Sequence, residues 1–197
     1  MGRDNHPRTR QKAKLARKKP KRADYDRILI VSEGEKTEPL YFNEIRQYYR
    51  LHTANIRILP SDYGTAPQQV VNFAKDECLK TKQWEKVFCV FDRDDHPSFY
   101  NAIKSVKALN KKHKNELKKP IEFKAIRSIP CFELWFLLHF IQITHEIHRD
   151  DVIKTLGHPN YLPRYDKGKA GYFEQTLPLL KKAYLHSSQL DYSAPIN

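Results

Sequence analysis

Residues 87–94 read VFCVFDRD, in which five apolar residues run directly into Asp92 and Asp94. An earlier stretch, residues 28–35, reads ILIVSEGE and has the same form, with Glu33 as its first acid. Continuous apolar runs of this length are typical of strands covered on both faces, as in a parallel sheet. The carboxyl ends of parallel strands lie at one edge, so we expect these acids to meet there. Carboxylates that lie close together repel each other unless a cation lies among them, and Mg²⁺ or Mn²⁺ is the simplest candidate.

Strand and helix signals alternate along the chain from Asp24 onward. Strands are predicted over residues 28–31, 56–59, 87–91 and 121–126. Helices are predicted from Pro39, after Pro67 and after Pro97, and over residues 131–140, 150–156 and 177–186. This order predicts an α/β fold, a three-layer α/β/α sandwich with a four-stranded, mainly parallel sheet. We expect a core over residues 25–140 and a helical C-terminal extension over residues 141–197.

Length and composition are those of a protein with one sizeable core. The chain has 197 residues, of which 40% are hydrophobic. Its longest apolar run, residues 131–140, is about half the length needed to cross a bilayer, so no membrane partner is expected. The N-terminus lacks the apolar stretch of a secretory signal. The three cysteines are widely spaced and fit neither a disulfide framework nor a zinc site, which predicts reduced thiols and a cytoplasmic location.

The net charge of +13 is concentrated at the N-terminus. Residues 1–22 carry ten basic side chains and one acid, Asp4, so this segment alone accounts for +9. The basic residues are Arg3, Arg8, Arg10, Lys12, Lys14, Arg17, Lys18, Lys19, Lys21 and Arg22. We predict that residues 1–24 form a disordered arm that binds the phosphate backbone of DNA or RNA without sequence selectivity. The alternative is a solubilising tail, or one that meets RNA or ribosomes incidentally.

The first strand is not followed by a nucleotide-binding motif. Residues 32–37, SEGEKT, match neither the Gly-x-Gly-x-x-Gly fingerprint nor a P-loop. Hard oxygen ligands instead favour a partly hydrated Mg²⁺ or Mn²⁺ that also binds substrate phosphates. Phosphodiester hydrolysis or transfer is the chemistry that follows from such a site.

Three blocks of sequence carry a resemblance to a known family: residues 28–38, residues 90–96, and residues 128–135 with His139-Phe140. A strand ending in Glu-Gly and a later strand ending in Asp-x-Asp resemble the Toprim domain of topoisomerases, primases and OLD-type nucleases. More specifically, the chain is similar to the RloB family, bacterial phage-defence proteins that include the AbiLii abortive-infection protein. The likeness covers roughly residues 25–140. The topoisomerase tyrosine module and the primase zinc domain are both missing from the sequence.

The resemblance implies a Mg²⁺-dependent nuclease of antiphage defence, with a partner ATPase of the same system as a further expectation. Glu33 matches the Toprim glutamate, a metal ligand or general acid/base, although it could instead cap the following helix. Asp92 and Asp94 match the metal-binding pair, although aspartates also begin turns. The alternatives to an enzyme are a non-catalytic nucleic-acid-binding or regulatory subunit and a metal-stabilised scaffold.

Further candidates lie around this core. Glu133 stands in an apolar stretch at the start of a helix, where it could be another metal ligand or form a buried ion pair with Arg127 or Lys124. Lys167, with its neighbour Lys169, resembles a late lysine that stabilises transition-state charge in such domains. His96 could assist proton transfer or lie on the rim. Glu35 and Glu38 could join the metal site and Lys36 could contact phosphate, but exposed charge explains all three adequately.

Overall fold

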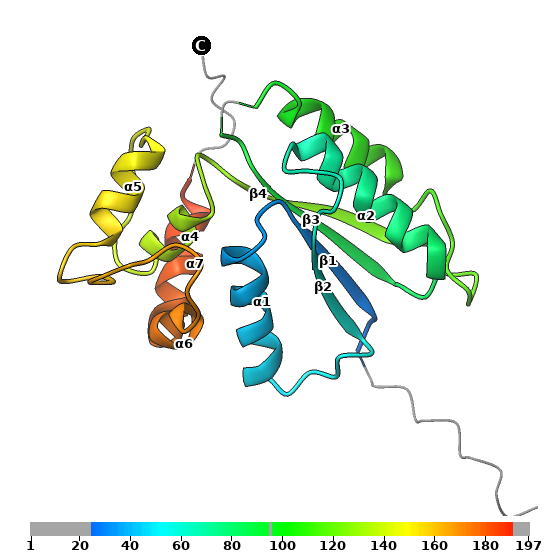
Figure 1. The fold of residues 1–197 in the computed structure, drawn as a ribbon, viewed down its shortest axis with the longest axis horizontal. Helices are drawn as coiled ribbons and strands as arrows, with labels where there is room; N and C mark the ends of the chain where they lie inside the picture. Colours follow the sequence, from blue (N-terminus) through cyan, green and yellow to red (C-terminus); the bar gives the residue numbers. More distant parts are fainter. Residues whose placement is uncertain (1–24, 95, 191–197) are drawn as a thin grey trace, which may run out of the picture.

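The computed structural model describes residues 25–94 and 96–190, which form one sheet with helices around it (Figure 1). The sheet has four strands, β1 (Ile28–Ser32), β2 (Ile56–Pro60), β3 (Lys86–Asp92) and β4 (Glu122–Ser128). They are all parallel and lie in the order β2-β1-β3-β4. The predicted α/β class and four-stranded sheet are therefore confirmed. Within the described ranges, no helix has the length and apolar character needed to span a membrane.

Helices cover both faces of the sheet. The crossover helices are α1 (Thr37–Tyr48), α2 (Pro67–Thr81) and α3 (Phe99–Leu109). The helices α2 and α3 pack on one face, over buried residues of alternate positions such as Leu29, Val31 and Cys89. The opposite face, with Val90 at its centre, packs against α1 and the C-terminal helices. The cysteines Cys78, Cys89 and Cys131 are free and buried, as predicted.

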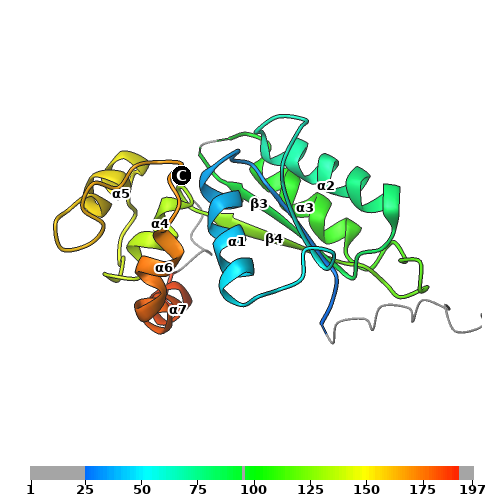
Figure 2. The ribbon, with the colours of Figure 1, turned by 60° about the horizontal axis from the view of Figure 1, so that its bottom comes forward.

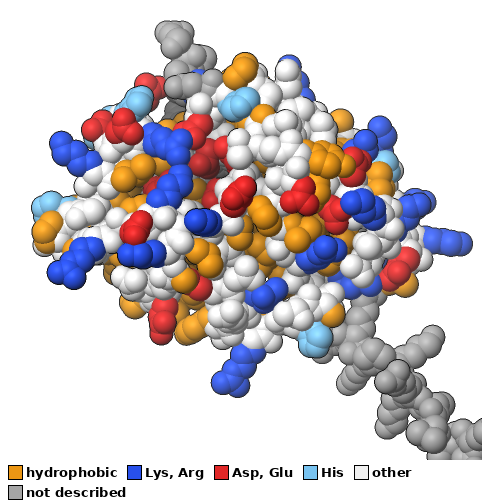
Figure 3. Space-filling model, in the orientation of Figure 1, with side chains coloured by type: hydrophobic (Ala, Val, Ile, Leu, Met, Phe, Trp, Pro, Cys, Tyr) orange, Lys and Arg blue, Asp and Glu red, His pale blue; other side chains and the backbone are white. Residues whose placement is uncertain are grey.

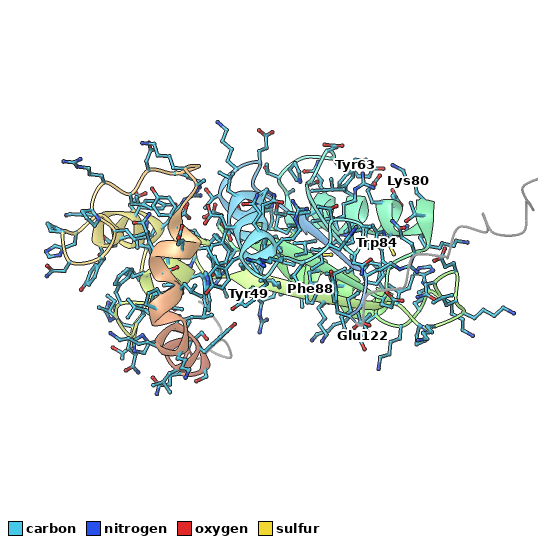
Figure 4. The ribbon with its side chains drawn as sticks, turned by 90° about the horizontal axis from the view of Figure 1, so that it is seen from below. Tyr49, Tyr63, Lys80, Trp84, Phe88 and Glu122 are labelled. Atoms are coloured by element: carbon cyan, nitrogen blue, oxygen red, sulfur yellow. The ribbon has the colours of Figure 1, made fainter. Side chains whose placement is uncertain are left out.

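The C-terminal helices gather beside α1, beyond the carboxyl ends of the strands (Figures 1 and 2). They are α4 (Glu133–Leu137), α5 (Arg149–Leu156), α6 (Tyr172–Thr176), the 3₁₀ helix η2 (Leu177–Leu179) and α7 (Leu180–Ser188). The amino ends of β3 and β4, marked by Trp84 and Glu122 in Figure 4, lie at the opposite end of the sheet.

One predicted helix boundary is wrong, and one helix was not predicted. The helix predicted over residues 131–140 ends at Leu137, and the carbonyls of Leu138 and Phe140 beyond it accept hydrogen bonds from His186 Nδ1 and Lys182 Nζ of α7. The helix α6 was not predicted, and its first N–H groups are capped by the Glu44 carboxylate of α1. Helical spacing over residues 177–186 predicts that Tyr184 faces inward, but its side chain is 60% exposed.

The order of the strands defines where a ligand can enter. The chain leaves β1 toward β2 on one side and later returns to β3 on the other side. The crossover connections therefore diverge between β1 and β3, and such a switch point leaves a crevice at the carboxyl ends of the two strands.

Leu29 lies at the centre of the core under α2 and is fully buried. Leu29→Ala is expected to lower the free energy of unfolding by roughly 2–5 kcal/mol, because it leaves a cavity. Leu117→Ala is the matched control, since Leu117 is 46% exposed and should cost well under about 1 kcal/mol. Urea unfolding measures both values, and equal losses would contradict this description of the core.

Candidate functional site

Four acidic side chains meet at the carboxyl edge of the sheet, at the switch point between β1 and β3. Glu33 follows β1, Asp92 ends β3, Glu38 lies in the first turn of α1 and Glu133 begins α4. We call these four residues the carboxylate cluster. Figure 3 shows acidic side chains gathered between the sheet and the C-terminal helices, with basic side chains around them.

Backbone hydrogen bonds fix two members of the cluster. The Glu33 N–H donates to the Val90 carbonyl at 2.9 Å, which extends the β1–β3 pairing by one residue. The Asp92 N–H in turn donates to Glu33 Oε2 at 3.0 Å. Asp92 Oδ2 accepts from the Phe132 N–H at 3.1 Å, so the loop before α4 holds the aspartate in place. The predicted proximity of Glu33 and Asp92 is thus built from main-chain contacts.

Two buried carboxylate oxygens in this cluster, Asp92 Oδ1 and Glu133 Oε2, have no hydrogen-bond partner among the residues that the structure describes. Glu133 is only 1% exposed, and its other oxygen, Oε1, accepts from Tyr165 OH at 3.1 Å and lies 3.4 Å from Lys167 Nζ. Buried polar atoms are almost always paired, so two such oxygens at one edge indicate a place for an additional cation.

Glu38 is a member of the cluster for which the sequence left two interpretations, a place in the metal site or an exposed charge. Exposed charge is wrong, since Glu38 is 5% exposed in the first turn of α1. Gly34 makes room for it, since a Cβ at this position would lie 2.1 Å from Glu38 Oε2. Glu35 and Lys36 are exposed, as predicted. The Lys36 stem lies against Gly168, next to Lys167.

The carboxylates of the cluster have raised pKa values. Burial raises the pKa of Glu33 to about 7; the Asp92 N–H opposes the shift, while Glu38 and Asp94 add to it. Burial, followed by the charges of Glu38 and Glu33, raises the pKa of Asp92 to about 8. Burial also raises the pKa of Glu38. Near neutral pH the site therefore takes up protons unless a cation replaces them.

Asp94 and Lys167 are each part of an ion pair next to the cluster. Asp94 has a left-handed φ of 36° and is ion-paired with Arg149 of α5. Lys167 reaches Glu133, whereas Lys169 pairs with Asp166 and is largely exposed. The residue paired with Glu133 is thus Lys167, and Lys124 instead pairs with Glu122.

Two other predictions concern His96 and the basic residues near the N-terminus. His96 Nδ1 is 3.3 Å from Ser98 Oγ, at the start of α3. The predicted nucleic-acid-binding residues, Arg8 to Arg22, lie outside the residues that the structure describes.

The donor set fits Mg²⁺ or Mn²⁺ in chemistry but is not closed around an ion. Within residues 25–94 and 96–190, no three His, Cys, Asp or Glu side chains are grouped so that they could hold a metal ion. Carboxylates repel each other, so they are expected to lie further apart when no cation is bound between them. The unpaired oxygens of Asp92 and Glu133 are the positions from which ligation would start.

Comparison with known proteins gives one match. The family model described as RloB-like protein matches residues 28–195, which includes all four strands and all the helices of the structure. No curated protein and no solved structure matches the chain.

Replacing Asp92 tests the electrostatics of the cluster. The pKa of Asp92 is about 8 in the fold and 3.8 as its ordinary value, so the folded state binds more protons between these limits. Unfolding free energy of the parent protein should therefore fall as pH rises from about 4 to 8. Asp92→Asn removes part of this loss, and should be more stable than the parent at pH 8 by roughly 1–3 kcal/mol, with little difference below about pH 5.

Urea unfolding across this pH range, with chelator and with millimolar Mg²⁺, measures the effect. Mg²⁺ should stabilise the parent protein at pH 8 and stabilise Asp92→Asn much less. Glu35→Gln is the control, because Glu35 is exposed and should leave the pH profile unchanged. If the free energies of unfolding of the parent protein and Asp92→Asn depended on pH in the same way, the pKa of Asp92 would not be raised in the fold.

Gly34→Ala tests the position of Glu38. The new methyl group would occupy the place of the Glu38 carboxylate and force it to move. We expect a melting temperature within a few degrees of the parent without metal, but a smaller stabilisation by Mg²⁺. Gly157→Ala is the matched control, since the nearest atom to its Cβ would be 3.6 Å away. An unchanged response to Mg²⁺ in Gly34→Ala would remove Glu38 from the site.

Proposed function

The chain belongs to the RloB-like family, and we propose that it is a divalent-metal-dependent nuclease that acts on DNA or RNA in bacterial antiphage defence. The observation that carries this proposal is the carboxylate cluster, with two unpaired buried oxygens, at the switch point of a parallel sheet. In this proposal β1, β3 and β4 form a Toprim-like core, and abortive infection of the AbiLii kind is the setting.

Glu33, Asp92 and Glu133 would hold the Mg²⁺ or Mn²⁺, with Asp94 as a further ligand when it leaves Arg149. The bound ion would polarise the scissile phosphate and lower the pKa of a water molecule. Glu33 would serve either as a ligand or as the acceptor of a proton from that water, and the pKa of about 7 that burial gives it without an ion suits the second role. Lys167, beside Glu133, would place a positive charge where charge develops on the phosphate.

The segment of residues 1–24 would supply affinity for phosphate backbones, separately from the cluster. A cytoplasmic location and a partner ATPase of the same defence system belong to the same proposal.

One observation favours a second candidate, a non-catalytic nucleic-acid-binding or regulatory subunit. The described residues contain no closed group of three metal ligands, and such a subunit would keep the fold without the chemistry. Cleavage and binding assays separate the two candidates. An enzyme should lose cleavage but keep binding when the cluster is changed, whereas a non-catalytic subunit should bind nucleic acid without cutting it.

Cleavage of labelled single-stranded and duplex DNA and RNA by the full-length protein, with Mg²⁺ or Mn²⁺, tests the nuclease proposal. Glu33→Gln and Asp92→Asn should each lower the cleavage rate by about 100-fold or more, because each removes a ligand or a proton acceptor. Binding measured with chelator should change little in either variant. Glu35→Gln again serves as the control and should cut like the parent. Failure to cut any substrate, alone or with the partner ATPase, would favour the second candidate.

A further inference from the structure

A cleft of about 690 Å³ lies between the first residues of α3 and the first residue of α5. The β3–α3 connection, the β4–α4 connection and residues 143–149 also line it. The four cluster residues do not line it, but it reaches Asp94, two residues beyond Asp92, and Asp94's partner Arg149 is part of the same wall. This volume lies in the range of sites that bind molecules of nucleotide size.

The wall of the cleft carries an excess of positive charge. Three arginines line it, Arg93, Arg127 and Arg149, against two acids, Asp94 and Glu146. The lining also contains His145 and His148, which add positive charge when protonated. Arginine side chains are well suited to phosphate, because their planar donors match its oxygens.

The cleft also has an aromatic and apolar part. Phe99, Ile129 and Ile143 line it beside the arginines. Tyr100 is 56% exposed there, and its ring packs edge-on against Phe99 at 5.5 Å between centroids. The Arg93 guanidinium lies 5.9 Å from the centre of the Tyr100 ring. Tyr100 is thus a ring supported by Phe99 with the Arg93 cation over one of its faces, so a base would stack on the opposite face while Arg93 binds a phosphate.

We propose that this cleft binds single-stranded nucleic acid and guides it to the carboxylate cluster. A base would stack on Tyr100 and fill the apolar part, and its phosphates would lie on Arg93, Arg127 and Arg149. A single strand suits the cleft better than a duplex, because only unpaired bases can enter an apolar pocket and stack on a side chain. A phosphate bound at Arg149 would lie beside Asp94, at the entrance to the cluster.

This inference rests on the proposed function, because it places the substrate of the nuclease. Binding of a single strand can nevertheless be measured without metal, where no cleavage is expected. The proposed binding site and the proposed nuclease activity can therefore fail separately. The cleft would still bind single strands if the protein cut nothing.

Fluorescence anisotropy of labelled single-stranded and duplex oligonucleotides, with full-length protein and chelator, tests the cleft. Tyr100→Ala should weaken single-strand binding at least about fivefold, whereas Tyr100→Phe should keep it, because stacking needs the ring and not the hydroxyl. Duplex binding should change little in both variants. Tyr48→Ala is the matched control, since Tyr48 is also 56% exposed but lies at the far end of α1.

Arg93→Gln tests the phosphate contacts in the same assay. It should reduce the slope of log affinity against log salt for single strands by about 0.7, as expected for one lost phosphate contact. Equal losses for Tyr100→Ala and Tyr48→Ala, or equal losses on single strands and duplexes, would overturn the inference. So would unchanged single-strand binding in Tyr100→Ala. If these variants behave as predicted while no substrate is cut, single-strand binding by the cleft is supported and the nuclease proposal is wrong.

Discussion

Repulsion among Glu33, Glu38, Asp92 and Glu133 is the constraint around which the edge of this sheet is organised. Three of these side chains are less than a tenth exposed, so water screens their charges poorly. Burial is the largest cause of the raised pKa values of Glu33 and Asp92, and neighbouring carboxylates add to it. A fold that needed only stability would place apolar residues here. The arrangement becomes favourable when a cation joins it, which is why the site and the metal are best considered together.

The positive groups of the structure are placed around this cluster but do not neutralise it. Lys167 lies 3.4 Å from one oxygen of Glu133, yet Glu133 Oε2 remains unpaired. Arg149 is paired with Asp94, which leaves Asp92 without a salt bridge. Both cations therefore stand at the rim, one on a C-terminal loop and one on α5. In the proposed nuclease, they would meet the phosphate of the substrate from the rim, and the centre would be left for a metal ion.

The sequence was sufficient to predict the strands and the acids at their ends. Continuous apolar runs mark β1 and β3, and the rule for parallel sheets brings Glu33 and Asp92 together without further information. The sequence could not distinguish a buried Glu38 from an exposed one, because its burial depends on the direction in which α1 leaves β1 and on the space that Gly34 provides. The short α4 and the added α6 were missed for a related reason. Backbone groups at or near their ends bond to His186, Lys182 and Glu44, which lie far away in the sequence.

The C-terminal helices are part of the site and not an appendage to it. Arg149 and Lys167 both come from beyond residue 140, and Tyr165 donates to the most deeply buried acid, Glu133. The core under β1 and β3 alone would leave Glu133 without these partners, and a lone buried carboxylate is costly. The helices also form one wall of the cleft that ends at Asp94. The same segment thus supports the carboxylates from one side and shapes the approach to them from the other, so changes in it should alter chemistry as well as stability.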